Sequence, residues 1–159
     1  MPQFRSVPAL IAYVKKNIDS ALDNEVFEVV KDTEIQSVNE VVYDAYSPKS
    51  YRRRRNHGGL SSESNVSKVG GGAHNGKLIV ENITPTNPFL NGVDASRGLS
   101  RSGSGPVLAG IVEFGYGYDY WRDSFAREFI YETILRLQAS DSCRNALKSG
   151  LLSRGIPVR

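Results

Sequence analysis

Apolar residues recur every three or four positions along the first forty residues, with charged residues between them. The stripe starts at Val7, and this spacing predicts an amphipathic helix. Ser6 is a candidate N-cap, and Pro8 falls in the first turn, where its missing N–H costs nothing. Residues 35–42 are rich in β-branched side chains and fit either a further helix or a strand. We therefore predict a helical part over residues 6–44.

The same helical spacing returns in the last part of the chain, residues 106–159. Residues 107–114 are apolar and fit a short helix or a buried strand. A second helix is predicted from apolar residues at helical spacing: Phe125, Phe129, Ile130, Ile134 and Leu137. Asp141 or Ser140 can cap a last helix, and Gly155 is a natural C-terminal stop.

The middle of the chain, residues 45–105, is rich in Gly, Ser, Asn and Pro and has few apolar residues. Residues 65–69 and 77–83 are candidate strands, and residues 70–76 between them have the composition of a long, mobile hairpin tip. We expect this polar stretch to gain shape only against neighbouring copies or other subunits.

These patterns predict one α+β domain over residues 1–159. Helices at both ends would pack on a small antiparallel sheet, and the middle of the chain would project as a long loop or hairpin arm.

Composition sets limits on the class of protein. The chain has 159 residues and one cysteine, so it forms no internal disulfide and no cysteine-based zinc cluster. No apolar run approaches the roughly 20 residues that span a bilayer. The first residues lack the apolar stretch of a secretory signal. We expect an intracellular or particle-bound protein without a membrane contact.

The strongest local signal is a basic run, KSYRRRR. It carries five positive charges and no negative one against a net charge of +3, so the rest of the chain sums to −2. Adjacent guanidinium groups repel one another unless anions lie close. We predict a basic loop that faces a partner protein or DNA, formed by Lys49, Arg52, Arg53, Arg54 and Arg55. A solvated loop without a specific partner is the third alternative.

Several motifs resemble catalytic or ligand-binding sites but lack a residue or a spacing that such sites require. Residues 71–77 fit the glycine and lysine frame of a phosphate-binding loop, yet Leu78 follows the lysine where a hydroxyl is required. His57 and His74 are too far apart for a metal-ligand pair of the usual spacing, and we expect both in solvated loops. Cys143 fits a small buried apolar residue. We therefore predict no catalytic residues, no metal and no cofactor.

Residues 114–121 contain five aromatic rings. Large amphipathic rings suit either a core or an interface between subunits. The candidate subunit contacts are Tyr46, Tyr51, Tyr116, Tyr118, Tyr120 and Trp121.

Several stretches resemble, in their order, small virion proteins of tailed bacteriophages that join head and tail or complete the tail. One is Tyr46–Arg53 (YSPKSYRR), followed by Gly58-Gly59-Leu60. Val112-Glu113-Phe114-Gly115 resembles their Val-Glu-aromatic-Gly box, and Ala126-Arg127-Glu128-Phe129 resembles the start of the helix that follows it. The ending, residues 147–156, is also similar.

The resemblance implies a structural virion protein that forms an oligomeric ring in the neck or upper tail. Its partners would be other copies of itself, the portal or adaptor, and the tail tube protein. It would act in the virion after assembly in the host cytoplasm. A sequence-independent nucleic-acid-binding module that uses Arg52–Arg55 is the alternative.

Overall fold

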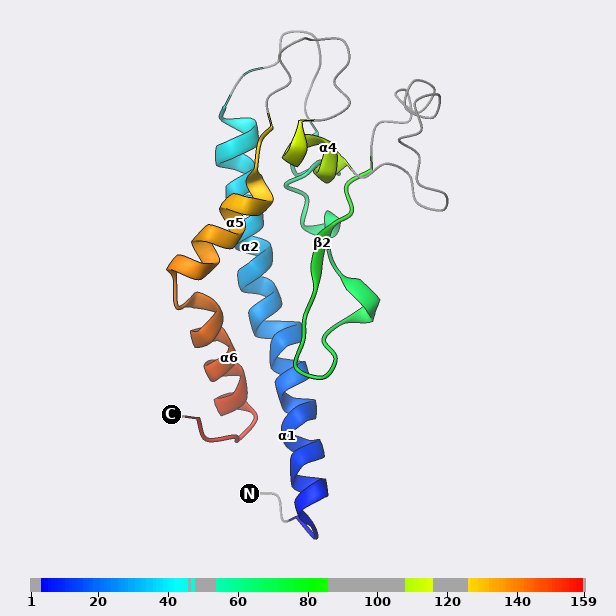
Figure 1. Cartoon of the computed structure of the whole chain (residues 1–159), viewed down its shortest axis with the longest axis vertical. Coiled ribbons are helices and arrows are strands. Elements are labelled where there is room, and N and C mark those ends of the chain that lie inside the picture. The colour runs from blue at the N-terminus through cyan, green and yellow to red at the C-terminus, as the bar shows by residue number, and fades with distance from the viewer. Residues whose placement is uncertain (1–3, 46, 48–53, 86–107, 116–125, 159) are drawn as a thin grey trace. The chain divides into compact units, whose positions relative to one another are not determined.

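The computed structural model describes residues 4–45, 47, 54–85, 108–115 and 126–158. Its helices are α1 (Val7–Ala21), α2 (Phe27–Ser37), α4 (Leu108–Phe114), α5 (Phe129–Ala139) and α6 (Ser142–Ser153). π-Helical turns η1 (Leu22–Val26) and η2 (Val38–Tyr43) follow α1 and α2 (Figure 1). Between Tyr43 and α4 lie the 3₁₀ turns η3 (Glu63–Asn65) and η4 (Val69–Gly71) and the strands β1 (Val66–Lys68) and β2 (Val80–Asn82). This confirms the predicted α+β class.

The N-terminal helical part was predicted correctly, and the open choice for residues 35–42 resolves to helix. Ser6 caps α1, because its hydroxyl accepts from the amide of Ala9 at 3.3 Å. Val38 and Val42 are buried on one side of η2. Their contacts in the core outweigh the β-preference of such side chains.

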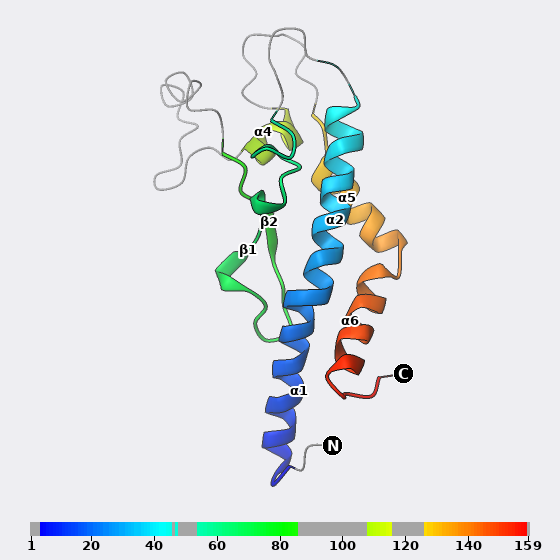
Figure 2. The ribbon, with the colours of Figure 1, turned by 180° about the vertical axis from the view of Figure 1, so that it is seen from behind.

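The chain forms two compact groups of residues. The first contains α1, η1, α6 and residues 68–81. The helices α1 and α6 lie side by side (Figures 1 and 2). Gly150 permits their close approach, since a Cβ there would lie 3.0 Å from the Cβ of Ala21 and 2.7 Å from Oε2 of Glu25.

The second group, residues 34–67 and 82–134, holds an apolar core. The core residues come from η2, the loop before η3, α4 and α5: Val38, Val42, Tyr43, Leu60, Ala109, Val112 and Phe129. The described residues of the apolar run at 107–114 form the helix α4 (Leu108–Phe114), one of the two structures predicted for that run. Phe129 is fully buried at the start of α5.

Part of the predicted arm is folded against the chain's own helices, so the expectation that it needs other subunits for its shape is wrong for residues 54–85. The predicted strands form a two-stranded antiparallel sheet. The amide of Val69 donates to the carbonyl of Ile79, and the amide of Ile83 donates to that of Asn65. Polar hydrogen bonds hold this stretch where apolar burial is small. The other residues of the arm lie outside the described part.

The last helix begins as predicted, with Asp141 at the N-cap position, although its carboxylate makes no capping bond. It forms an ion pair with Arg144 instead. Gly155 follows the helix with a φ of +76°, the left-handed conformation that glycine adopts readily. Cys143 is half-buried rather than fully buried, and burial raises the pKa of its thiol.

Candidate interaction surface

The structure describes two of the predicted basic residues, Arg54 and Arg55. The others, Lys49, Arg52 and Arg53, lie outside the described residues. So do all six candidate subunit contacts: Tyr46, Tyr51, Tyr116, Tyr118, Tyr120 and Trp121. Their roles stay predictions.

The two described arginines differ in their surroundings. Arg54 is half-buried, and its guanidinium donates to the carbonyl oxygen of Pro85. Arg55 is exposed, with its guanidinium carbon 5.5 Å from the centre of the Tyr43 ring. This cation–π contact holds the positive charge at the surface. Of the two, Arg55 is the one available to a partner.

A tight turn positions Arg55. His57 donates its amide to the carbonyl of Arg54 at 2.9 Å, and Gly59 donates to the carbonyl of Arg55 at 2.8 Å. Arg55 itself has a φ of +48°, which is uncommon for a residue with a Cβ. A side chain at Gly59 would lie 2.6 Å from the amide nitrogen of Arg55 and 2.9 Å from the hydroxyl of Tyr43. Only glycine fits there.

Tyr43 joins this turn to the helix. Its hydroxyl accepts from the amide of Leu60 at 3.1 Å, and Leu60 is buried in the core. The Gly58-Gly59-Leu60 series therefore has a physical role: the glycines close the turn, and the leucine fixes it to the apolar core.

A buried polar network supports the turn. The side-chain amide of Asn82 donates to Oε1 of Glu34 at 2.8 Å and to the carbonyl of Leu60 at 2.9 Å. Its oxygen accepts from the amide of Thr84 at 3.1 Å and from the hydroxyl of Thr84. That hydroxyl also lies 3.3 Å from the carbonyl of Gly59. Asn82, Glu34 and Thr84 are all buried.

Burial raises the pKa of the Glu34 carboxyl. The bond from Asn82 opposes that shift, and the nearby negative charge of Glu113 adds to it. Sequence reasoning missed this network. A glutamate in an amphipathic helix is expected to face solvent, and no local pattern indicates that Glu34 meets Asn82, 48 positions away.

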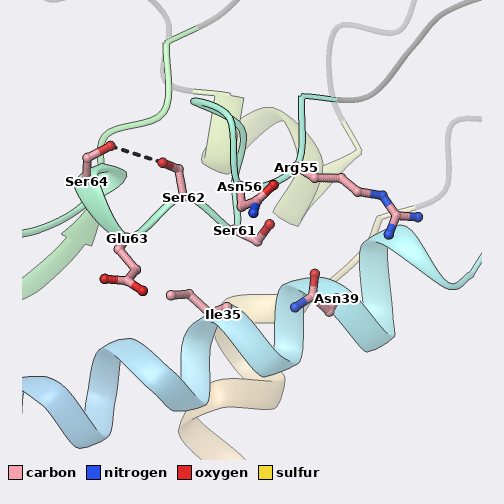
Figure 3. Close-up of a pocket in the computed structure, with 8 residues that line it drawn as sticks. All are labelled: Ile35, Asn39, Arg55, Asn56, Ser61, Ser62, Glu63 and Ser64. Carbon is pink, nitrogen blue, oxygen red and sulfur yellow. Dashed lines mark hydrogen bonds between the residues drawn. The ribbon is translucent and has the colours of Figure 1, made fainter.

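An open cleft of about 610 Å³ lies beside Arg55. Figure 3 shows Ile35 and Asn39 on the helix facing the loop residues across this cleft. Its remaining lining comes from Arg55, Asn56 and the residues 61–64. The hydroxyls of Ser62 and Ser64 are hydrogen-bonded to each other at 3.0 Å. The described part of the lining is therefore mostly neutral and polar, with one cation, Arg55, and one carboxylate, that of Glu63.

Comparison with known proteins assigns the chain to a family. The profile of the YomN family matches residues 6–153, most of the chain. The chain belongs to the YomN family. That family name marks a phage-derived protein of the SPBc2 prophage type, so this YomN-family chain is phage-associated. No curated protein and no solved structure matches it.

The main-chain amides of the glycine-rich loop in this YomN-family chain donate to two carboxylates elsewhere in the same chain. Oδ1 of Asp23 accepts from the amide of Ala73 at 2.7 Å, and Oδ1 of Asp19 accepts from the amide of Gly76 at 2.7 Å. The chain then continues into β2 rather than into a helix. This confirms the hairpin over a phosphate-binding loop, and the tip is hydrogen-bonded to α1 and η1 rather than free.

The two histidines are the remaining candidates for chemistry. His57 and His74 are exposed, as predicted. Within the described ranges, no group of three His, Cys, Asp or Glu side chains is placed to hold a metal ion. Among the helices described, none is long and apolar enough to cross a membrane.

Three residues of the Val-Glu-Phe-Gly series each have a different place in the structure. Val112 is buried in the core. Glu113, also buried, accepts from the amides of Ile130 and Tyr131 at 2.8 and 3.0 Å, and so caps the start of α5. Phe114 ends α4 with 63% of its surface exposed. The series thus fixes the position of α5 and leaves an aromatic ring outside.

Two helices carry apolar side chains that the described residues leave exposed. On α5 they are Ile130, Tyr131, Ile134 and Leu135, here called the α5 stripe. On the first turns of α1 they are Val7, Leu10 and Ile11. Contiguous exposed apolar patches on a helix indicate an interaction surface more often than isolated ones do.

Proposed function

We propose that this chain is a structural subunit of a tailed-phage virion, without catalytic activity, that assembles into a ring in the neck or upper tail and joins head to tail. The α5 stripe is the observation that carries the proposal. Four large apolar side chains on one short helix are exposed in the single chain. Assembly with other copies would remove them from water.

Two further features support this role. The chain is phage-associated by family. The stretches that resemble head–tail joining and tail-completion proteins also have defined places in the fold: Gly58-Gly59-Leu60 closes the turn at Arg55, and Glu113 caps the helix that bears the stripe. The portal or adaptor and the tail tube protein are the expected neighbours of the ring.

Electron microscopy and mass measurement of the purified protein test the proposal. We expect rings for the natural chain and monomers for a variant with Ile130→Ser and Ile134→Ser. The exposed residue Gln138 lies on the same helix, and Gln138→Ser is the control, which should keep the rings. Circular dichroism must show that the serine variant is folded. A natural chain that stays monomeric and is absent from purified particles would refute the assembly role.

Nucleic-acid binding is the second candidate function, and it is favoured by the exposed guanidinium of Arg55 within a run of five positive charges. Replacing Arg52–Arg55 by serine tests it. A nucleic-acid role predicts a steep fall of DNA affinity with salt in the natural chain and a flatter slope in the variant.

A further inference from the structure

Arg55 lies at the cleft, with its guanidinium against the ring of Tyr43. Within the described part of the chain, no carboxylate lies within ion-pair distance of its guanidinium, and its contact is with the ring of Tyr43. The side-chain amides of Asn39 and Asn56 line the same cleft, and neither forms a hydrogen bond among the residues described. A cation and two amides are therefore available to a ligand with a negative group and with polar main-chain groups.

The charges of the described lining bear on the kind of partner. Among the residues that the structure describes, the cleft is lined by one cation, Arg55, and one carboxylate, Glu63. Nucleic acid is bound by grooves with several cations, because each phosphate carries a charge. Arg54, the neighbouring cation, already donates to the carbonyl of Pro85. The described lining, with Arg55 as its cation, therefore matches a partner that offers a single, spaced carboxylate.

We propose that the cleft binds an extended polypeptide segment of a partner protein, with a carboxylate of that segment on Arg55 and its main chain on Asn39 and Asn56. Guanidinium and carboxylate match as a pair of parallel hydrogen bonds. Side-chain amides pair with both the donor and the acceptor of a peptide unit. The cleft volume of about 610 Å³ falls in the range of ligand sites. The inference rests on the proposed assembly role for the source of the segment.

The turn at residues 54–59 prepares the cleft for binding. Two main-chain hydrogen bonds close it, and the ring of Tyr43 lies against the guanidinium of Arg55. Because the side chain is already held, less conformational entropy is lost when a carboxylate binds.

Nuclear magnetic resonance of the whole chain with short peptides tests the inference. The probes are a capped peptide of sequence Gly-Ser-Glu-Ser-Gly and the same peptide with Gln for Glu. We expect the Glu peptide to shift the side-chain amide signals of Asn39 and Asn56 and the Nε–H signal of Arg55. The Gln peptide and the variant Arg55→Gln should each weaken binding by about tenfold or more.

Arg144→Gln is the matched control, because Arg144 is an exposed arginine on α6 in an ion pair with Asp141. It should bind the Glu peptide as the natural chain does. The inference is overturned if the Glu peptide shifts none of these signals or if the Gln peptide binds equally well. It is also overturned if duplex DNA of about 20 base pairs shifts these signals in the natural chain but not in Arg55→Gln, while the Glu peptide shifts none. Peptide binding is measured in the background of Ile130→Ser and Ile134→Ser, which is expected to be monomeric. A failure to bind therefore leaves ring formation by the natural chain standing, and a failure to form rings leaves the peptide result standing.

Discussion

Asn82 donates its side-chain amide to the carboxylate of Glu34 at 2.8 Å, inside the core that supports the turn at Arg55. The same amide also donates to the carbonyl of Leu60. The two residues lie 48 positions apart in the sequence, and this contact joins the first helical part to the second strand. The position of Arg55 thus depends on a buried polar pair far from the basic run itself.

Replacing Glu34 by Gln should raise the free energy of unfolding at pH 7. Burial raises the pKa of Glu34 above the ordinary value of 4.5, so the folded state binds this proton more tightly than the unfolded state does. The stability it contributes is complete below about pH 4.5 and is lost as the pH rises through the raised pKa. Gln keeps an oxygen for Asn82 and removes the charge. Denaturant unfolding between pH 4 and 8 should show a flatter profile for Glu34→Gln.

Glu81→Gln is the control for that change, since Glu81 is exposed on β2 next to Asn82. It should leave the profile unchanged in the same range. A Glu34→Gln variant that is less stable at pH 7 than the natural chain would show that Glu34 acts as a stabilising charge.

Replacing Asn82 by Asp should strongly destabilise the fold at neutral pH, by about 3–5 kcal/mol. Two carboxylates would then face each other where a donor and an acceptor now meet at 2.8 Å. They can share this site only by holding a proton between them, so acid should restore part of the stability. Thermal unfolding at pH 7 and pH 4.5 measures the recovery, and an equal loss at both pH values would contradict it.

Gly59→Ala should destabilise the chain by about 2–4 kcal/mol. The added Cβ would meet the main chain of Arg55 and lie 2.9 Å from the hydroxyl of Tyr43. Gly58→Ala is the comparison, because Gly58 has a φ of +77° but open space around it. It should cost only about 1 kcal/mol, from backbone strain. Similar losses for the two variants in urea unfolding would rule out close approach as the cause.

Arg154→Met should lower the free energy of unfolding at pH 7 by about 1–3 kcal/mol. Arg154 donates to Glu25 at 2.9 Å and to the carbonyl of Gly150 at 2.6 Å. Its hydrogen bond holds the pKa of Glu25 below the ordinary value of 4.5. The stability from this pair is therefore present above about pH 4.5 and lost as the pH falls through the lowered pKa, and the variant should lack that acid loss.

The control for this pair is Arg144→Met on α6, where the ion pair with Asp141 is largely exposed. Its effect should stay within about 0.5 kcal/mol. Chemical denaturation at pH 7 and pH 3.5 compares the two variants. A loss for Arg154→Met that is the same at both pH values would show that its packing, and not its charge, carries the effect.

Replacing both Asp19 and Asp23 by Ala should release the hairpin tip. Their carboxylates accept from the amides of Gly76 and Ala73, each at 2.7 Å. Amide hydrogen exchange at Ala73 and Gly76 should then become at least about tenfold faster, while exchange in α6 changes little. Asp32→Ala, at an exposed position of α2, is the control. Unchanged exchange at the tip would show that the glycine loop holds its shape without these bonds.

The elements were largely predictable because each depends on local spacing. The stripe from Val7, the cap at Ser6 and the stop at Gly155 are all present at their predicted positions. The two strands were predicted within residues 65–69 and 77–83, on either side of a glycine-rich stretch, and are three residues long each. The choice between helix and strand at residues 35–42 and 107–114 was open, since a short apolar run fits both until its neighbours in the core are known.

The sequence by itself determined the α+β class, the helical ends, the hairpin and the basic run, because hydrophobic period, caps and turn residues act over a few positions. Only the tertiary structure decided that residues 54–85 are folded, that Arg54 is hydrogen-bonded to the carbonyl of Pro85 while Arg55 is exposed, and that Glu34 is buried. These outcomes depend on hydrogen bonds between residues many positions apart. A local sequence pattern does not indicate which carboxylate will accept from which amide.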